Sequence, residues 1–359
     1  MNTRFDLRRE RAWERVREAA PDAEGFLVTS LVNIRYLTGF TGSNAVLMMG
    51  PAHATLGTDA RYVIQASQEC PDLEQLIDRD TLSAVAHSWA GSAGGPLAVE
   101  SEHLSLAQYR SLATEVPQLR ETLQIVEHCR VVKDAAEIDL IAQACRISDE
   151  ALADVIATVR EGDTERAIAR RLEAAMFARG ADAISFDTIV ASGPNSAIPH
   201  HSPTDRPLAK GEFLLIDFGA AVGGYHADET RTFVLGAPDE WQKEVHALVR
   251  SAQECARVAA TAGADLAAVD RAARGVIESA GRGEEFGHGL GHGVGLQIHE
   301  APFMSARATG MLLAGSPVTI EPGVYLPERG GVRIEDTVAV TEGPCIPLTT
   351  TDRELLVLG

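Results

Sequence analysis

The sequence lacks the features that mark membrane-spanning and secreted proteins. Among its 359 residues, no apolar run approaches the roughly 20 residues that a membrane-spanning helix requires. The first 20 residues, MNTRFDLRRERAWERVREAA, carry charges throughout and contain no apolar core of a secretory leader. These absences predict a soluble, cytoplasmic protein without a membrane segment.

Cysteine is also scarce. The chain has five cysteines, none in a Cys-x-x-Cys pair, and their odd number argues against a closed disulfide framework. This usage favours reduced and mostly buried thiols at Cys70, Cys129, Cys145, Cys255 and Cys345.

Positive charge is in deficit. The chain has 32 Lys and Arg residues against 51 Asp and Glu residues, which gives a net charge of −19 at pH 7. A nucleic-acid partner needs a basic surface, so this balance argues against one. Hydrophobic residues make up 45% of the chain, which is typical of a folded protein. Because the length exceeds that of one average core, two domains are expected.

The first part of the chain, residues 1–127, alternates helical and β-type segments. The expected elements are helices over 8–20 and 104–116 and strands over 25–30, 44–50 and 96–101. Residues 54–70 change from a strand into a helix that we expect to begin near Asp59. This alternation predicts an α/β domain.

The pattern changes in residues 128–359, which we expect to form an α+β domain. One amphipathic helix starts near Asp134, and a second has Asp163 or Thr164 as its N-cap and Gly180 just past its end. Two further helical stretches, over residues 241–263 and 265–281, precede a second group of β-type runs. A helix pair followed by strands therefore occurs twice, which suggests a duplicated layout.

Residues 286–301, FGHGLGHGVGLQIHEA, place three histidines among five glycines. Each glycine inside a helix costs about 1 kcal/mol relative to alanine, so a helix is disfavoured here. A strand or bulged loop that lets another group approach the backbone closely is expected instead.

Four carboxylates lie in β-type runs of the second domain: Asp217 in FLLIDFG, Asp228 in YHADETRTF, Glu321 in VTIEPGVY and Glu335 in VRIED. A carboxylate in an apolar strand is costly unless it is paired or binds a cation. Taken singly, Asp217 could cap a turn, and Asp228 could pair with Arg231. Glu335 could likewise pair with Arg333.

Taken together with the histidine segment, these carboxylates suggest a dinuclear metal centre. Four carboxylates carry a charge of −4, which two divalent cations would balance. A donor set of oxygens with one nitrogen suits Mn²⁺, Co²⁺, Fe²⁺ or Zn²⁺. Two such ions about 3.5–4 Å apart can lower the pKa of a shared water and polarise a carbonyl group.

Five motifs occur in the order IDFG, HADETRTF, HGLGHGVGLQIHE, IEPGVY and VRIED. This series resembles the pita-bread metallopeptidases, which include methionine aminopeptidase, aminopeptidase P and prolidase, and SGPNSAIPHH favours the proline-specific branch. NIRYLTGFTGSNAVL and TDARY are similar to the leading domain of that branch. The resemblance implies a ribonuclease-H-like α/β domain over residues 1–127 and a pita-bread catalytic domain over residues 128–359.

The resemblance also implies a role for each motif residue. The implied metal ligands are Asp217, Asp228, His292, Glu321 and Glu335. Asp228 and Glu335 would bridge two divalent ions, with manganese favoured over cobalt or zinc. Glu321 would also take a proton from the metal-bridging water, and the resulting hydroxide would be the nucleophile.

The substrate pocket implied by the resemblance is lined by His200, His288, His299, Tyr325 and Arg333. The three histidines would hold the scissile carbonyl or the substrate carboxylate and stabilise the oxyanion. Arg333 lies on the same strand face as Glu335 and would hold a carboxylate beside the metals or the substrate terminus.

Two other histidines stay open. His200 and His201 are neighbours, so one should face the pocket and the other solvent, and the position before the IDFG strand favours His200 as the pocket residue. His226 lies two residues before Asp228, close enough to contribute to the site.

The implied reaction is hydrolysis of the Xaa-Pro bond, a tertiary amide on which general peptidases often fail. The length favours an Xaa-Pro dipeptidase (prolidase) over an aminopeptidase P that acts on longer peptides. A homodimer is implied, in which the leading domain, often that of a partner subunit, closes the site. The complete ligand set argues against two metal-free alternatives on this scaffold, a creatinase-like hydrolase and a non-catalytic binding protein.

Overall fold

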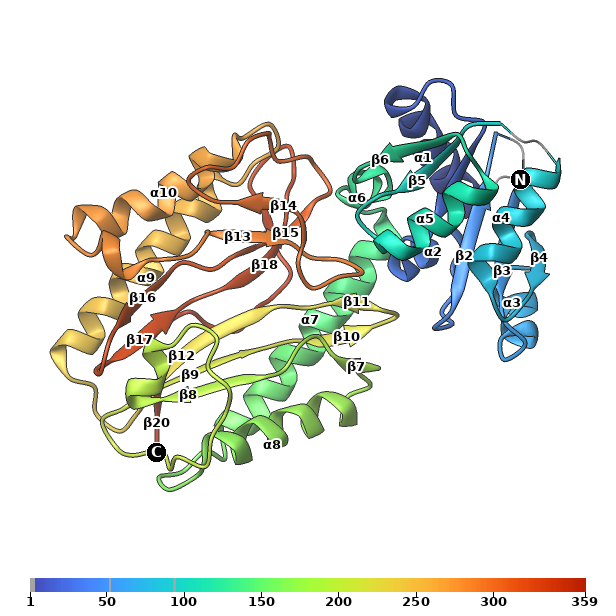
Figure 1. Cartoon of the computed structure of the whole chain (residues 1–359). Helices are drawn as coiled ribbons and strands as arrows, with labels where there is room; N and C mark the ends of the chain where they lie inside the picture. The colour runs from blue at the N-terminus through green and yellow to red at the C-terminus, as the bar shows by residue number, and fades with distance from the viewer. Residues whose placement is uncertain (1–3, 52, 93–94) are drawn as a thin grey trace. The chain divides into compact units, whose positions relative to one another are not determined.

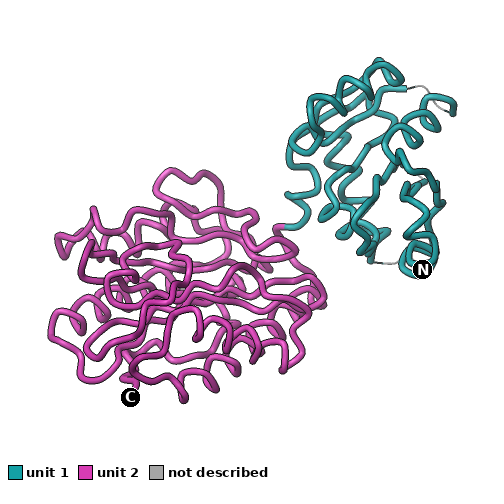
Figure 2. The backbone as a smooth tube through the Cα atoms, turned by 60° about the horizontal axis from the view of Figure 1, so that its bottom comes forward, with its two compact units in different colours: residues 1–130 teal, residues 131–359 magenta. Residues whose placement is uncertain are grey.

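The computed structural model describes residues 4–51, 53–92 and 95–359, which divide into two compact units, unit 1 over residues 1–130 and unit 2 over residues 131–359 (Figure 2). The expected domain boundary after residue 127 falls within the last helix of unit 1. In the described ranges, no helix is long and apolar enough to cross a membrane. All five cysteines are free, and three of them are buried.

Unit 1 is an α/β unit built on one six-stranded sheet in the order β4-β3-β2-β1-β5-β6 (Figure 1). Its strands are β1 (Gly25–Val28), β2 (Ala45–Met49), β3 (Ala54–Thr58), β4 (Glu74–Ile77), β5 (Leu97–Glu100) and β6 (Leu119–Thr122). Its helices are α1 (Arg4–Ala19), α2 (Leu31–Thr38), α3 (Val63–Glu69), α4 (Thr81–Ser92), α5 (Leu106–Glu115) and α6 (Ile125–Arg130). Strand β2 is antiparallel to both of its neighbours, whereas the outer pairs are parallel.

The helix that the sequence predicted to begin near Asp59 begins later, at Val63. The Asp59 carboxylate accepts hydrogen bonds from the backbone and side chain of Arg61, which holds residues 59–61 in a turn. The other predicted elements of unit 1 are present within a few residues, and α/β is confirmed as its fold class.

Unit 2 contains two helix pairs, each followed by a sheet, so the duplicated layout is confirmed (Figure 1). The helices are α7 (Ala135–Ile156), α8 (Glu165–Ala178), α9 (Glu240–Ala259) and α10 (Leu266–Ser279). One sheet has the order β20-β12-β9-β8, with β8 (Ile189–Ser192), β9 (Phe213–Phe218), β12 (Glu229–Leu235) and β20 (Val357–Leu358). The other has the order β14-β13-β15-β18-β19, with β13 (Gly291–Gly293), β14 (Glu300–Met304), β15 (Pro317–Ile320), β18 (Asp336–Ala339) and β19 (Ile346–Pro347).

Smaller sheets complete unit 2. One has the order β11-β10-β7 and comprises β7 (Ala183–Ile184), β10 (Ala220–Val222) and β11 (Tyr225–His226). The other is a hairpin of β16 (Gly323–Leu326) and β17 (Gly330–Arg333). Two short 3₁₀ helices, η1 (Gly193–Ala197) and η2 (Gly283–Glu285), lie in the connections.

The helices of unit 2 begin and pack as their sequences predict. Asp134 forms a capping box with Glu137, and the Thr164 hydroxyl accepts a hydrogen bond from the backbone of Ala167. Gly180 follows α8 with a φ of +96°, which a glycine adopts without strain. In α9 and α10, buried residues recur every three or four positions and pack with the strands in one core, as at Val245, Val249, Ala252, Ala256, Val269, Ala273 and Ile277.

Candidate metal centre

Residues 291–293 of the glycine-rich segment form strand β13, where a strand or bulge was expected. A Cβ atom on Gly291 would lie 2.1 Å from the carbonyl oxygen of Thr319, and one on Gly293 would lie 2.2 Å from that of Ala301. The pairing with β14 shifts register between His292 and Gly293. Only glycine fits beside His292, and the bulge sets the direction of the imidazole.

Thr230 joins the two sheets that carry the carboxylates. On β12 it lies opposite Asp217 of β9, and it also forms an isolated bridge with Glu335, which precedes β18. The Thr230 hydroxyl donates a hydrogen bond of 2.6 Å to Glu335 Oε2. Asp228 lies just before β12, and Glu321 just after β15. Residues more than 100 positions apart are therefore brought to one place.

Hydrogen-bond acceptors face one another at this junction. His292 Nε2 lies 3.6 Å from Asp228 Oδ2 and 3.6 Å from Glu321 Oε1. One donor atom each from Asp228, His292 and Glu335, all buried, lie within 4.8 Å of one another. His292 Nδ1 is 3.1 Å from the carbonyl oxygen of Gly293 and donates to it, so Nε2 of the neutral ring presents a lone pair to the carboxylates.

The electrostatics of the site favour a bound cation. Burial, together with the neighbouring carboxylates, raises the pKa of Asp228 and of Glu335 well above the ordinary values. Burial also raises the pKa of Glu321 to about 8 and lowers that of His292 to about 4. Packing several carboxylates and a neutral imidazole together is unfavourable unless a positive charge lies between them.

The ordinary ion pairs suggested for single residues are not the ones observed. Arg231 contacts Glu229 at 3.1 Å and Asp336 at 2.8 Å, which are its ion-pair partners in the described part of the chain, so it does not neutralise Asp228. Arg333 donates to Asp217 Oδ2 at 2.6 Å. The second oxygen of Asp217, Oδ1, is buried and has no hydrogen-bond partner among the described residues.

These residues fit a divalent metal centre. The donor set is four carboxylates and one imidazole, which suits first-row transition metals. The imidazole donates its other N–H to a backbone carbonyl, as metal-binding histidines commonly do. The unpartnered Asp217 Oδ1 and the mutually facing acceptors are atoms that a metal ion would satisfy.

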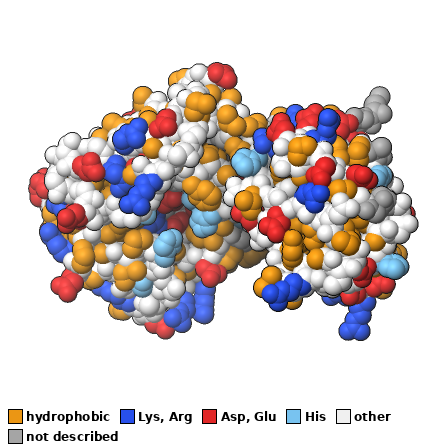
Figure 3. Space-filling view, turned by 45° about the horizontal axis from the view of Figure 1, so that its top comes forward, with side chains coloured by type: hydrophobic (Ala, Val, Ile, Leu, Met, Phe, Trp, Pro, Cys, Tyr) orange, Lys and Arg blue, Asp and Glu red, His pale blue; other side chains and the backbone are white. Residues whose placement is uncertain are grey.

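The centre lies in a cavity of about 560 Å³ within unit 2, a size suited to a small ligand. Figure 3 shows acidic and histidine atoms together in a hollow on the face of this unit. Of the site residues predicted from the sequence, the structure places nine in the cavity lining: His200, Asp217, Asp228, His288, His292, His299, Glu321, Arg333 and Glu335.

Comparison with known proteins identifies the family. Residues 139–342 match metallopeptidase family M24, and residues 8–132 match the creatinase/prolidase N-terminal domain. The chain belongs to metallopeptidase family M24. It is 42% identical over 243 residues to the Xaa-Pro dipeptidase of Pyrococcus furiosus, which covers 68% of this chain and 70% of that protein.

Solved structures support the same M24 assignment and the mixed α/β pita-bread fold. The Xaa-Pro dipeptidase from Bacillus anthracis has a TM-score of 0.95 at 35% identity and covers 99% of this chain and 100% of its own. The X-Pro aminopeptidase from Thermotoga maritima has a TM-score of 0.90 at 37% identity and covers 98% of this chain and 99% of its own.

A hydrogen-bonded chain lies beside the M24 metal centre. Tyr325 accepts a hydrogen bond of 2.8 Å from Arg333 Nη1, and its hydroxyl lies 2.9 Å from His288 Nε2. Burial lowers the pKa of His288 to about 4, so the neutral ring accepts the hydroxyl proton of Tyr325. Burial also raises the pKa of Tyr325 to about 12. Tyr325 is not among the cavity-lining residues, and its hydroxyl is engaged by these two neighbours.

The other histidines of this M24 chain fall into distinct settings. His299 packs edge-on against His292 with ring centroids 4.4 Å apart, and its pKa is lowered by burial. His200 and His201 both line the cavity, and they differ in exposure: His200 is exposed, whereas the His201 side chain is only 9% exposed. His226 is absent from the cavity lining, and its Nδ1 lies 2.9 Å from the carbonyl oxygen of Gly295.

Sequence reasoning missed two residues that organise the site. Thr230 holds Glu335, and the buried Glu165 binds His201. Glu165 is hard to recognise in the sequence because it occupies the first turn of a helix, where acidic residues are common. Its hydrogen-bond partners lie in the loop over residues 192–204, which reaches Glu165 only in the folded chain.

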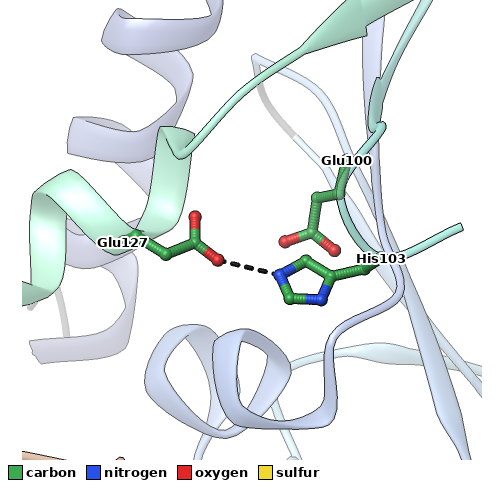
Figure 4. A group of neighbouring side chains, drawn as sticks. All are labelled: Glu100, His103 and Glu127. Atoms are coloured by element: carbon green, nitrogen blue, oxygen red, sulfur yellow. Dashed lines mark hydrogen bonds and ion pairs between the residues drawn. The ribbon is translucent and has the colours of Figure 1, made fainter. Parts of the chain in front are cut away.

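A second group of metal-type side chains lies in unit 1: Glu100, His103 and Glu127 (Figure 4). Glu100 Oε2 accepts hydrogen bonds from the backbone of Thr29 and Ser30, at 2.6 and 2.9 Å. The Asn33 amide donates to both Glu100 and Glu127 at 2.6 Å, and His103 Nε2 lies 3.0 Å from Glu127. Hydrogen-bond donors of the protein therefore already bind these carboxylates.

Proposed function

We propose that this M24 metallopeptidase is an Xaa-Pro dipeptidase that depends on two divalent metal ions. The observation that carries the proposal is the convergence of buried Asp228, His292 and Glu335 at the base of a histidine-lined cavity. Support for the substrate comes from the Xaa-Pro dipeptidases of Pyrococcus furiosus and Bacillus anthracis, to which the chain is similar.

In this proposal the metal ions, with manganese favoured, are held by Asp217, Asp228, His292, Glu321 and Glu335. Asp228 and Glu335 would be the ligands shared by the two ions, since both are buried and both lie near the other carboxylates. When bound, two such ions would polarise the scissile carbonyl and lower the pKa of the attacking water.

Glu321 is proposed as the group that takes the proton from the attacking water. Its side chain is 19% exposed, compared with 11% for Asp217 and 6% for Asp228, so it is the ligand most open to the cavity. Without a cation, burial raises the pKa of this carboxylate to about 8. A proton taken there can pass to the proline nitrogen as the bond breaks.

His200, His288 and His299 are proposed to hold the substrate around the reacting carbonyl. His299 could offer an N–H to the oxyanion. Both ring nitrogens of His288 are engaged, Nδ1 by the carbonyl oxygen of Gly289 and Nε2 by the Tyr325 hydroxyl, so His288 would line the pocket rather than donate to the oxyanion. Arg333 is proposed to position Asp217 rather than the substrate, because it already donates to Asp217, Tyr325 and the carbonyl oxygen of Pro199.

The alternative activity is that of an Xaa-Pro aminopeptidase acting on longer peptides, which is supported by the similarity to the X-Pro aminopeptidase from Thermotoga maritima. Steady-state hydrolysis of Ala-Pro and Ala-Pro-Ala separates the two. The dipeptidase proposal expects cleavage of Ala-Pro that is lost with chelator, restored by Mn²⁺, and faster than cleavage of the tripeptide. Equal or faster cleavage of Ala-Pro-Ala would establish the aminopeptidase instead.

The proposal includes a homodimer in the cytoplasm, in which the leading domain closes the substrate pocket. Light scattering coupled to size-exclusion chromatography tests the dimer through its mass, and a monomer at micromolar concentration would contradict it.

A further inference from the structure

Glu165 is the centre of a hydrogen-bond cluster behind one wall of the cavity. It lies in the first turn of α8 and is 0% exposed. Oε1 accepts from the backbone and hydroxyl of Ser192 and from Asn195, at 2.8, 2.9 and 2.9 Å. Oε2 accepts from the backbone and hydroxyl of Thr204, at 3.0 and 2.6 Å, and is 2.9 Å from His201 Nε2.

The cluster determines which nitrogen of His201 carries a proton. Burial alone would raise the pKa of Glu165, but hydrogen bonds from Thr204, His201, Asn195 and Ser192 lower it to about 2. Glu165 is therefore ionised at neutral pH and can only accept. His201 Nε2 must then be the donor, and the ring is held in one orientation.

The opposite nitrogen, His201 Nδ1, is available to a ligand. The His201 side chain is only 9% exposed, it lines the cavity, and within the described residues the hydrogen bond to Glu165 is the one its ring makes. Because Glu165 is ionised, it could balance the charge of a protonated His201 ring. The ring could then offer a charge-assisted N–H to an anion in the cavity.

The other basic groups of the cavity are less suited to this task. Both ring nitrogens of His288 are engaged, by the carbonyl oxygen of Gly289 and by Tyr325, and the His299 ring packs against His292. Arg333 is 3% exposed and is engaged by Asp217, Thr230 and Tyr325. His200 also lines the cavity, but among the described residues it has no carboxylate partner, so His201 is the lining histidine whose positive charge an ionised neighbour would balance.

We propose that His201, positioned by Glu165, binds the free carboxylate of the Xaa-Pro dipeptide. This inference rests on the proposed function, because it assigns the group that distinguishes a substrate ending in a free carboxylate from a longer one. His201 is thus a substrate-binding residue, whereas Glu165 is a positioning residue that acts through it.

The test measures binding of the product end of the substrate, so it does not depend on turnover. Calorimetry with Mn²⁺-loaded protein compares proline with prolinamide, which lacks the carboxylate charge. Replacing His201 with Gln should weaken proline binding by about 10- to 100-fold, the range for hydrogen bonds to charged groups, and leave prolinamide within about twofold. His201→Ala should behave in the same way, which guards against a defect particular to Gln.

Glu165→Gln and a matched control complete the design. Glu165→Gln should reduce proline affinity as His201→Gln does, and circular dichroism shows whether the variant is folded. His103→Gln removes a similar His–Glu contact from unit 1 and should leave both ligands unaffected (Figure 4). Equal loss of proline and prolinamide binding in the His201 variants, or no loss of either, would overturn the inference.

The kinetic companion experiment separates this inference from the proposed function. If Ala-Pro is cleaved, His201→Gln should raise KM for Ala-Pro by the same factor while kcat changes less than about twofold, and KM for Ala-Pro amide should not change. If Ala-Pro is not cleaved by wild-type protein, the dipeptidase proposal fails, and the calorimetric comparison still decides the role of His201.

Discussion

Two clusters of histidine and carboxylate side chains, one in each unit, look alike in composition and differ in what lies between their members. In unit 1, the Asn33 amide donates to both Glu100 and Glu127, and two backbone N–H groups donate to Glu100. In unit 2, the atoms of Asp228 and His292 face each other across 3.6 Å with no interposed donor in the described structure.

The comparison shows that spacing alone does not identify a metal site. Both clusters place their possible ligand atoms within 4.8 Å of one another. In unit 1, burial raises the pKa of Glu100, but hydrogen bonds from Asn33 and His103 overcome the effect of burial and lower that of Glu127. In unit 2, burial and neighbouring carboxylates raise the pKa of Glu335 well above its ordinary value. Because hydrogen-bond donors already bind both carboxylates of the first cluster, we expect a metal in the second cluster and none in the first.

The largest effect is expected from Asp228→Asn. Loss of a bridging carboxylate should remove nearly all bound metal and lower turnover by more than about 100-fold, which exceeds the loss caused by partners outside the ligand shell. Metal content by elemental analysis and Ala-Pro hydrolysis measure it. The matched control is Glu127→Gln in unit 1, which should leave both values unchanged. Retained metal in Asp228→Asn, or metal loss in the control, would contradict the assignment of the metal site to unit 2.

Substitutions of His292 and His299, whose rings pack edge-on, should separate metal binding from catalysis. His292→Ala should lower metal affinity by about 10- to 100-fold or more, because it removes the nitrogen ligand. His299→Ala should retain the metal and lower kcat, because its ring packs against His292 from the cavity side. Metal titration and kinetics on each variant provide the measurement. An equal loss of metal in both variants would show that the ligand is assigned to the wrong ring.

An intermediate effect is expected from Glu165→Gln, measured as stability against pH. Its folded pKa of about 2 lies below the ordinary 4.5, so the ionised carboxylate stabilises the fold above pH 4.5, and this contribution is lost as pH falls through about 2. Urea denaturation should show the variant less stable at pH 7, on the order of 3 kcal/mol, with the difference shrinking toward pH 3. A difference that does not vary with pH would contradict this assignment.

The smallest effect is expected from Asn33→Ala, which removes the shared donor of the unit 1 cluster. It should destabilise unit 1 by about 1–3 kcal/mol, because the buried Glu100 Oε1 loses its donor and Arg130 Nη1 loses the Asn33 acceptor. Urea denaturation measures this change, and the metal content of unit 2 should stay the same. A variant as stable as wild type would show that the hydrogen bonds of Asn33 do not stabilise the unit 1 cluster.

The sequence predicted local features better than long-range ones. The glycines around His292 predicted a strand or bulge, because glycine density and close approach are local properties. The placement of Thr230 between Asp217 and Glu335 could not be predicted, since it depends on the pairing of two sheets. The late start of α3 also escaped prediction, because the Asp59 side chain competes with the helix for backbone hydrogen bonds.

The same limit applies to the pocket. Motif order pointed to His200, but a single sequence could not show that a buried carboxylate 36 positions earlier holds His201. Tyr325 was expected to line the cavity, yet its hydroxyl is taken by Arg333 and His288. Which member of a histidine pair is held, and by what, depends on contacts that the chain makes only after folding.

The bridge at Thr230 has a consequence for assembly. Asp217 and Asp228 come from the first half of unit 2, whereas His292, Glu321 and Glu335 come from the second. The five proposed ligands therefore come together only when the two halves of unit 2 dock. If metal ions bind here as proposed, their retention would report on the integrity of this junction, and a substitution that loosens the contact at Thr230 would weaken metal binding.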